Sequence, residues 1–354
     1  MIGIFPKPVT GMSIFNKFIL KHISSIDSNP LIINYSPESL SFSLRYFYKK
    51  NYRYVCGFFR LFYFLIMGKI SNVYISLSGG LGQLYEFIIL LLCKIFSKKI
   101  FIHHHSYKYL NKFSLLSFFV FHFAGKKTVH IVACMKMKND LLRVYPSIVK
   151  VRILSGVITT EQTYEAFSRR SKLKTIGFIS NISFEKGIED FIDIADRMNN
   201  AGLPVSFILA GSYQNKKVQN LIQKRISMNS NINYIGPVQG IEKSNFYKSI
   251  DLLLFPTKYI HESEGIVIHE ALSNGIPVIT YKRGCIEQFI SSKNGFGVSP
   301  SENFVNLAEK VILNWISDPN LFQSISINAF NSYQKYKSLN NQRFRKLVDE
   351  ILSI

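Results

Sequence analysis

The sequence predicts an α/β protein with two doubly wound domains in tandem. Apolar stretches with strand length and alternation recur along the chain, and stretches with helical spacing separate them. This pattern is typical of βαβ units and a mostly parallel sheet. The pattern stops at the polar stretch 159–174 and then restarts, so this stretch is the expected linker. The length of 354 residues also fits about two domains.

The first half begins with an expected short strand at residues 1–5, a turn containing Pro6, Pro8 and Gly11, and a helix from Ser13 to about Ser24. A loop with three glycines, at 78–82, precedes an expected helix at 83–96. The other strands of this half share apolar, β-branched residues and are expected at 72–77, 99–103, 128–133 and 150–154.

The second half repeats the alternation and ends in a tail, 302–354, that is expected to be mostly helical. Its strands are expected at 175–180, 205–211, 232–236, 251–256 and 277–281. Its helices are expected at 187–198, 215–227, 242–249 and 265–274. We therefore predict a first domain at 1–160, a second domain at 161–335 and a last helix at 336–354.

The positive charge is confined to one half of the chain. The formal net charge is +21, and residues 1–170 carry +17 of it, from 23 Lys and Arg against 6 Asp and Glu. Residues 171–354 carry only +4. A strongly basic half attracts polyanions or an anionic membrane surface, and charge alone does not choose between them. With 47% hydrophobic and 18% charged residues, a disordered chain is excluded.

Three apolar segments of the basic half, 54–67, 84–96 and 113–125, are shorter than the roughly 20 residues that cross a bilayer. Basic and aromatic residues flank them, a composition typical of helices that lie in a membrane interface. Buried helices with solvated basic ends are the alternative interpretation. We expect a protein of the cytoplasm that binds peripherally to the anionic inner face of the cell membrane.

The cysteines and the N-terminus indicate the compartment. The four cysteines form no CxxC pair and no cluster with zinc spacing, which favours a reduced, cytoplasmic protein without a structural metal. The first thirteen residues, MIGIFPKPVTGMS, lack the basic and apolar regions of a signal peptide.

The stretch from Phe255 to Thr280 carries the strongest chemical signal. A strand ends at Pro256, and after a loop a helix begins near Gly265. The backbone N–H groups of Gly265, Ile266 and Val267 at that helix start, together with the helix dipole, form an anion site suited to a diphosphate. Further along the helix, Glu270 could hold a ribose diol, and before it Glu262 could face a sugar beyond the phosphates.

These residues resemble a known family. Glu262 and Glu270, with seven residues between them and GIVIHEALSNGIPVI around the second, look like the Glu-x7-Glu motif of retaining family 4 glycosyltransferases of the GT-B fold. The resemblance is strong from 175 to 285 and weak before 150. Further pieces with family-like sequence follow in the family's order: PVTGM (8–12), LSGV (154–157), FISNISFEKGIEDFIDIA (178–195), FILAGSY (207–213) and YIGPV (234–238).

The resemblance implies two Rossmann-like domains facing a central cleft: 1–160 would bind the acceptor, 161–335 would bind the nucleotide sugar, and the helix 336–354 would cross back onto the first domain. It also implies transfer of a hexosyl group from a nucleoside-diphosphate sugar with retention and without a metal or other cofactor. Carried over, the catalytic residues would be His105, Glu262 and Lys186, with Lys186 on the diphosphate. The nucleotide side would comprise Glu270, Gly265, Ile266, Val267, Asn181, Gly211 and Pro237, and Gly11 would belong to the acceptor and phosphate loop. The sequence looks most like bacterial transferases for surface polysaccharide, O-antigen or capsule, which implies a lipid-linked saccharide acceptor.

Two positions depart from the family pattern. Asn181 stands where the family usually has an arginine, so either Arg283 or a base of the first domain supplies the missing charge, or turnover is lower. Glu264 adjoins the anion site, where it could cap the helix or replace Glu262 at the sugar.

The family's histidine is followed by a small polar residue, so the resemblance selects His105, which precedes Ser106, from His103–His105. Alternation along the strand puts His103 and His105 on one face and His104 on the other.

Other functions stay open at this point. A GT-B-like protein could bind a nucleotide sugar without catalysis, or be another GT-B enzyme such as an epimerase or phosphorylase. A nucleic-acid-binding protein would fit the charge, but the sequence carries no helix-turn-helix, RRM or zinc-finger signature. We therefore expect no nucleic-acid partner.

Overall fold

The computed structural model describes residues 1–353 except 7–9, 27–28, 37–43 and 161–169, and the side chains of 44–47 are likewise not described. Pro8 of the expected turn and most of the expected linker lie outside the described residues. The chain divides into two compact units. One comprises Met1–Thr159 with Leu339–Ile354, and the other Thr160–Ser338, where the sequence analysis places boundaries at 160 and 335.

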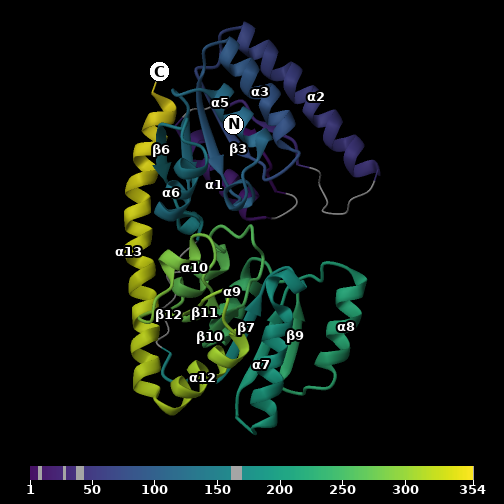
Figure 1. The fold of residues 1–354 in the computed structure, drawn as a ribbon, viewed down its shortest axis with the longest axis vertical. Coiled ribbons are helices and arrows are strands. Elements are labelled where there is room, and N and C mark those ends of the chain that lie inside the picture. The colour runs from purple at the N-terminus through teal and green to yellow at the C-terminus, as the bar shows by residue number, and fades with distance from the viewer. Residues whose placement is uncertain (7–9, 27–28, 37–43, 161–169, 354) are drawn as a thin grey trace. The chain divides into compact units, whose positions relative to one another are not determined.

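The first unit contains a six-stranded parallel sheet in the order β2-β1-β3-β4-β5-β6 (Figure 1). The strands are β1 (Ile2–Gly3), β2 (Ile33–Asn34), β3 (Asn72–Leu77), β4 (Lys99–His104), β5 (Val129–Val132) and β6 (Lys150–Ile153). The five expected strands are confirmed. The sequence analysis missed β2, which has only two residues and pairs with β1 through Ile2 and Ile33.

The helices of the first unit connect these strands in βαβ order. They are α1 (Gly11–Ser24), α2 (Leu44–Ile66), α3 (Gln83–Ile95), α4 (Lys108–Asn111), α5 (Leu115–Ala124), α6 (Met135–Val144) and the 3-10 turn η1 (Gly156–Thr159). Thr10 begins α1, because its side chain accepts a hydrogen bond from the Ser13 amide while the Ser13 hydroxyl accepts one from the Thr10 amide. In the described part of the chain, no helix is both long and apolar enough to cross a membrane.

The second unit contains another six-stranded parallel sheet, in the order β12-β11-β10-β7-β8-β9. The strands are β7 (Thr175–Ile179), β8 (Ser206–Ala210), β9 (Ile232–Gly236), β10 (Leu252–Phe255), β11 (Val278–Tyr281) and β12 (Gly295–Val298). The chain builds outward from β7 in one direction and then from β10 in the other, so the strand order reverses between β7 and β10. In open α/β sheets, ligands bind beyond the carboxyl ends of the strands at such a switch point.

Helices cover this second sheet and continue into the C-terminal tail. They are η2 (Phe184–Lys186), α7 (Ile188–Asn200), α8 (Lys216–Ile226), α9 (Ile241–Ser249), α10 (Ile266–Ser273), α11 (Ile286–Phe289), α12 (Phe304–Ser317) and α13 (Pro319–Leu352). The predicted helical tail is confirmed. The end of α13 packs in the first unit, where Arg152 pairs with Glu350 at 3.0 Å and the Asn72 side chain donates to the Ile351 carbonyl.

Aromatic rings anchor β7 and β8 to α7. Phe191 of α7 lies 5.4 Å from Phe178 of β7 and 5.6 Å from Phe207 of β8, measured between ring centroids, and all three side chains are fully buried. Burial of one such ring stabilises the fold by about 2 kcal/mol. This packing fixes β8 and the switch-point strand β7, and therefore the loops that follow them.

Candidate active site

Two loops meet at the switch point, one after β7 and one after β10. Gly187 has φ +79°, and a Cβ atom placed on it would lie 1.9 Å from the carbonyl oxygen of Pro256. A side chain therefore does not fit, and the two loops touch through bare backbone. The Lys258 amide donates to the Glu185 carbonyl at 2.8 Å, which fastens the loops a second time.

Lys186 and Glu262 face each other across these loops. The Lys186 ammonium forms a hydrogen-bonded ion pair with Glu262 Oε2, which also accepts from Thr257 Oγ1 at 3.3 Å. The ammonium lies 4.9 Å from the ring centroid of Tyr259 and 5.8 Å from that of Phe255. A partly buried cation held by a carboxylate and two aromatic faces is positioned for an anionic ligand.

The helix start at α10 lies at the end of the same loop. Gly265 is its N-cap, with φ +64°, and as a glycine it has no side chain to cap the helix. Its first N–H groups are therefore available to an anion of the size of a phosphate. Gly265, Ile266 and Val267 are half-buried.

The two acidic residues before α10 have different surroundings. Glu264 is buried, and its Oε1 lies 3.6 Å from Nε2 of the buried His269. That Glu264 caps α10 stays a prediction. Glu262, in contrast, lies against Lys186. On this geometry, Glu262 is the carboxylate that adjoins the cation.

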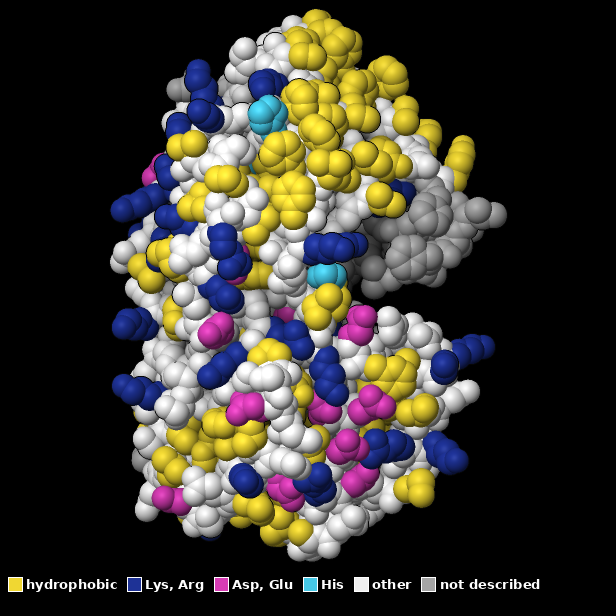
Figure 2. All heavy atoms as spheres, in the orientation of Figure 1, with side chains coloured by type: hydrophobic (Ala, Val, Ile, Leu, Met, Phe, Trp, Pro, Cys, Tyr) yellow, Lys and Arg dark blue, Asp and Glu magenta, His cyan; other side chains and the backbone are white. Residues whose placement is uncertain are grey.

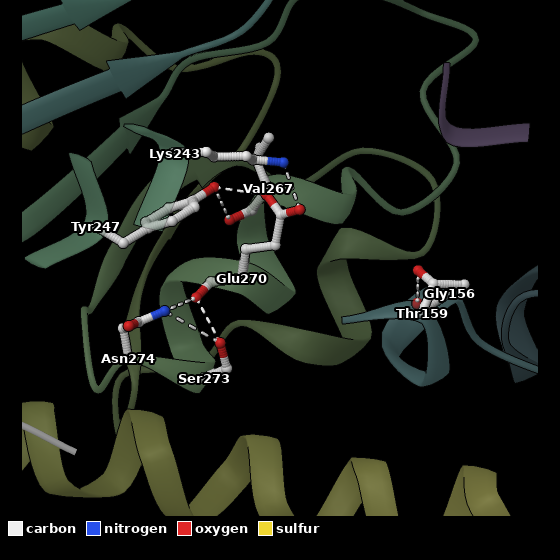
Figure 3. A network of polar contacts seen from close by, with 8 residues as sticks. All are labelled: Gly156, Thr159, Lys243, Tyr247, Val267, Glu270, Ser273 and Asn274. Atoms are coloured by element: carbon white, nitrogen blue, oxygen red, sulfur yellow. Dashed lines mark hydrogen bonds and ion pairs between the residues drawn. The ribbon is translucent and has the colours of Figure 1, made fainter. Parts of the chain in front are cut away.

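Both carboxylate oxygens of Glu270 are held by α9 (Figure 3). Lys243 Nζ lies 2.5 Å from Oε1, and the Tyr247 hydroxyl donates to Oε2 at 2.7 Å. Burial, reinforced by the Glu270 carboxylate, holds the pKa of Tyr247 well above its usual value, so the hydroxyl keeps its proton and donates. Two donors fix the Glu270 carboxylate in one orientation.

The sequence analysis did not single out Lys243 and Tyr247. Their four-residue spacing in the expected helix 242–249 puts them on one face, which was the available signal. The sequence alone does not say which strand end that face meets. The packing of α9 beside α10 supplies this information.

The other expected nucleotide-side residues lie at the ends of β7, β8 and β9. Gly211 has φ +136°, and a Cβ atom there would lie 1.8 Å from the Ser180 carbonyl oxygen. Its amide donates to the Gly236 carbonyl at 2.8 Å. Asn181 follows Ser180 and Pro237 follows Gly236, and both are exposed. The three strand ends thus hold Asn181, Gly211 and Pro237 at one edge of the sheet.

A second lysine at this edge is also held by a carboxylate. Lys258 Nζ lies 2.8 Å from Asp190 Oδ1. Burial lowers the pKa of Lys258, but the hydrogen bond and charge of Asp190 outweigh burial, so the pKa is raised overall. Arg283, which follows β11, lies over the Tyr281 ring at 5.8 Å. That Arg283 replaces the charge absent at Asn181 stays a prediction.

In the first unit, the three histidines at the end of β4 alternate as predicted. The rings of His103 and His105 lie 4.1 Å apart, whereas His104 Nε2 lies 2.9 Å from His130 Nδ1 on the other side. His105 Nε2 is 3.4 Å from the Ser76 hydroxyl. Burial lowers the pKa of His105 to about 3, so its imidazole is neutral.

Two glycine-containing segments of this unit have different structures. Gly11 is the first residue of α1, at the carboxyl end of β1, where the strand order of the first sheet reverses.

In the loop after β3, the Ser78 amide and hydroxyl donate to the buried carboxylate of Glu86, at 2.9 and 2.6 Å. Burial raises the pKa of Glu86 to about 7. An internal acid thus occupies the donors that a phosphate would need, which argues against a phosphate site in that loop.

No group of three or more metal-ligating side chains is assembled anywhere in the described residues.

The sequence of the second unit matches a known family. A family model described as Glycosyl transferases group 1 matches residues 160–332, which is nearly all of the second unit. The chain carries a glycosyl transferases group 1 domain.

Curated relatives match part of this chain. An uncharacterized glycosyltransferase of Methanocaldococcus jannaschii is 27% identical over 148 residues, which is 40% of this chain and 36% of the relative. An uncharacterized 42.6 kDa protein in the cps region of Klebsiella pneumoniae is 29% identical over 117 residues, which is 32% of this chain and 28% of the relative. The matches thus span about a third of the length of these relatives.

Solved structures match the fold over nearly the whole chain. Anabaena HepE in complex with UDP has a TM-score of 0.71 at 15% identity, covering 98% of both chains. Sucrose-phosphate synthase from Thermosynechococcus elongatus has a TM-score of 0.71 at 15% identity, covering 99% of both. These likenesses establish the fold: the two sheets belong to two Rossmann-like domains of the GT-B fold, as predicted.

Proposed function

We propose that this protein is a retaining, metal-independent glycosyltransferase that uses a nucleoside-diphosphate hexose. The observation that carries the proposal is the convergence at one switch point of the Lys186–Glu262 pair, the uncapped start of α10 and the fixed Glu270 carboxylate. A cation and free helix N–H groups suit a diphosphate, and a carboxylate of fixed orientation suits a ribose diol. HepE, which shares the fold, has been solved with UDP and with UDP-glucose.

In the proposed reaction, the acceptor hydroxyl oxygen bonds to the anomeric carbon while the bond from that carbon to the diphosphate oxygen breaks. The leaving diphosphate takes the hydroxyl proton on the same face of the sugar, which retains the configuration. Lys186 and the α10 amides stabilise the charge that develops on the leaving group. Glu262 orients the sugar and Glu270 orients the ribose. The neutral imidazole of His105 is assigned to binding the acceptor.

The acceptor in this proposal is a lipid-linked saccharide, and the product feeds surface polysaccharide such as O-antigen or capsule. Two observations support it. The Klebsiella relative is encoded in a cps region, and residues 1–170 carry most of the positive charge, which would hold the enzyme at the cytoplasmic face of an anionic membrane.

The proposal is tested by following donor cleavage with UDP-, GDP-, ADP- and CDP-sugars in the presence of EDTA. We expect release of one nucleoside diphosphate, insensitive to EDTA. The sugar released first is expected to keep the donor's anomeric configuration in NMR spectra. Loss of turnover on chelation or release of the inverted anomer would contradict the mechanism. Glu262→Gln is the site control and should slow turnover.

A non-catalytic nucleotide-sugar-binding protein is the second candidate. Asn181 favours it, because a neutral side chain stands at a phosphate-facing position where the resemblance implies an arginine. This candidate predicts binding of a nucleotide sugar without cleavage, either alone or with membrane extracts as a source of acceptor.

A further inference from the structure

One surface of the first unit exposes apolar side chains from three helices. Figure 2 shows them gathered over α2, α3 and α5, with basic side chains at the border. On α2 the exposed residues follow a spacing of three and four and form one stripe along the helix: Tyr48, Tyr52, Val55, Phe59, Phe62 and Ile66. A stripe of this kind on a monomer usually marks an interaction surface.

The outward direction of this stripe is fixed by the opposite face of α2. Gly57 packs so closely on β2 that a Cβ atom there would lie 2.6 Å from Ile33 Cγ2. Tyr54 is buried between the rings of Tyr35 and Tyr85, at centroid distances of 4.5 and 3.9 Å. The helix cannot rotate to bury Phe59, which is 63% exposed, without losing these contacts.

The neighbouring helices extend the same surface. On α3, Leu84, Ile88 and Ile95 are exposed at helical spacing, and on α5, Leu115 and Phe119 are exposed. Side-chain contacts join the three helices: Phe62 meets Phe96 just after α3, Phe87 of α3 meets Phe123 of α5, and Ser117 of α5 donates to Gln83 of α3 at 2.7 Å. The apolar residues therefore belong to one continuous face.

The charge around this face selects the partner. Residues 44–127 carry 13 lysines and arginines and a single acidic residue, Glu86, which is fully buried. A second copy of the chain would bring the same positive charge against it, without acidic side chains to compensate. The exposed basic residues around the face include Arg60, Lys69, Lys94, Lys112, Lys126 and Lys127. Apolar and aromatic side chains surrounded by lysines match the acyl boundary and phosphates of an anionic bilayer.

We infer that α2, α3 and α5 together form a membrane-docking face that lies flat on an anionic bilayer. This inference deepens the proposed function, on which it rests for the membrane-bound acceptor. Phe59, Ile88 and Phe119 would enter the interface, one from each helix. Lys94, Lys126 and Lys127 would lie at the level of the phosphates.

The test is co-sedimentation of the full chain with phosphatidylcholine vesicles, with and without phosphatidylglycerol, at low and high salt. We expect binding to the anionic vesicles that weakens at high salt. Lys94→Gln/Lys126→Gln/Lys127→Gln should weaken vesicle binding about a hundredfold, since each lysine near an anionic surface contributes about fivefold. Phe59→Ser/Ile88→Ser/Phe119→Ser should also release the protein.

Matched controls come from the second unit. Lys216→Gln/Lys293→Gln/Lys310→Gln removes three exposed lysines and Met228→Ser/Leu313→Ser two exposed apolar side chains, and both should bind like the wild type. Equal binding by all variants, or no vesicle binding, would overturn the inference. A dimer in sedimentation velocity that is lost in the Phe59→Ser/Ile88→Ser/Phe119→Ser variant would also overturn it. Salt-sensitive binding to DNA instead of vesicles would overturn it as well.

Nucleotide-induced thermal stabilisation is measured on the same variants. Lost vesicle binding with an intact nucleotide response confirms that the face, and not the fold, was changed. Intact vesicle binding without any nucleotide response would count against the proposed function alone.

Discussion

Replacing Lys186 by glutamine is expected to lower kcat for sugar transfer by about 10² to 10³-fold. Lys186 carries the ammonium group held at the switch point by Glu262 and by the rings of Tyr259 and Phe255. Glutamine keeps the length and a hydrogen-bond donor but removes the charge that would stabilise the leaving diphosphate. Initial rates over a range of donor concentrations separate this loss of kcat from a change in KM.

Lys310→Gln is the matched control, since it removes an exposed lysine of the same unit on α12. It should leave kcat and KM unchanged. The Lys186→Gln protein should retain its melting temperature to within a few degrees, because the pair it breaks is partly exposed. A Lys186→Gln enzyme with the turnover of the wild type would remove Lys186 from the mechanism.

Replacing Gly187 by alanine is expected to reduce the free energy of unfolding by about 4 kcal/mol or more. The new Cβ atom would lie 1.9 Å from the Pro256 carbonyl, and the residue would be forced to keep φ +79°. The loops after β7 and β10 would have to separate, which would also displace Lys186 from Glu262. Urea unfolding followed by circular dichroism measures the change.

Gly202→Ala controls for the backbone conformation alone. Gly202 has φ +65°, but nothing lies within 4 Å of a Cβ atom placed there. Its substitution should lower the free energy of unfolding by only about 1 kcal/mol, because alanine is disfavoured in the left-handed conformation. Equal losses in the two variants would show that the contact between Gly187 and Pro256 is not what fixes the loops.

The strands could be predicted from sequence wherever burial made them continuously apolar, as in β7 and β10. The sequence analysis missed β12 because GFGV reads as a turn. Gly295 is required there by close approach, since a Cβ atom would lie 2.3 Å from the Val278 carbonyl oxygen. That reason is tertiary and is not visible in the local pattern. The two-residue β2 was missed because it carries almost no local signal.

The candidate site was partly visible from sequence. Glu270 stood out because a carboxylate in an apolar helix needs a partner, but its partners, Lys243 and Tyr247, depend on how α9 packs. Spacing favoured Glu262 over Glu264 as the carboxylate at the sugar. The structure separates them, because the loop turns Glu264 toward His269 and Glu262 toward Lys186.

The most direct measurement of the central claim, a nucleotide site at the start of α10, is thermal unfolding with UDP, GDP, ADP and CDP in the absence of divalent metal. The wild type is compared with Glu270→Gln, which keeps the shape of the side chain but not its charge. At a hundredfold excess over Kd, a bound nucleotide should stabilise the wild type by about 2.7 kcal/mol. The account predicts that one nucleotide raises the Tm of the wild type and has little effect on Glu270→Gln. No response to any of the four, or an equal response in both proteins, would contradict it.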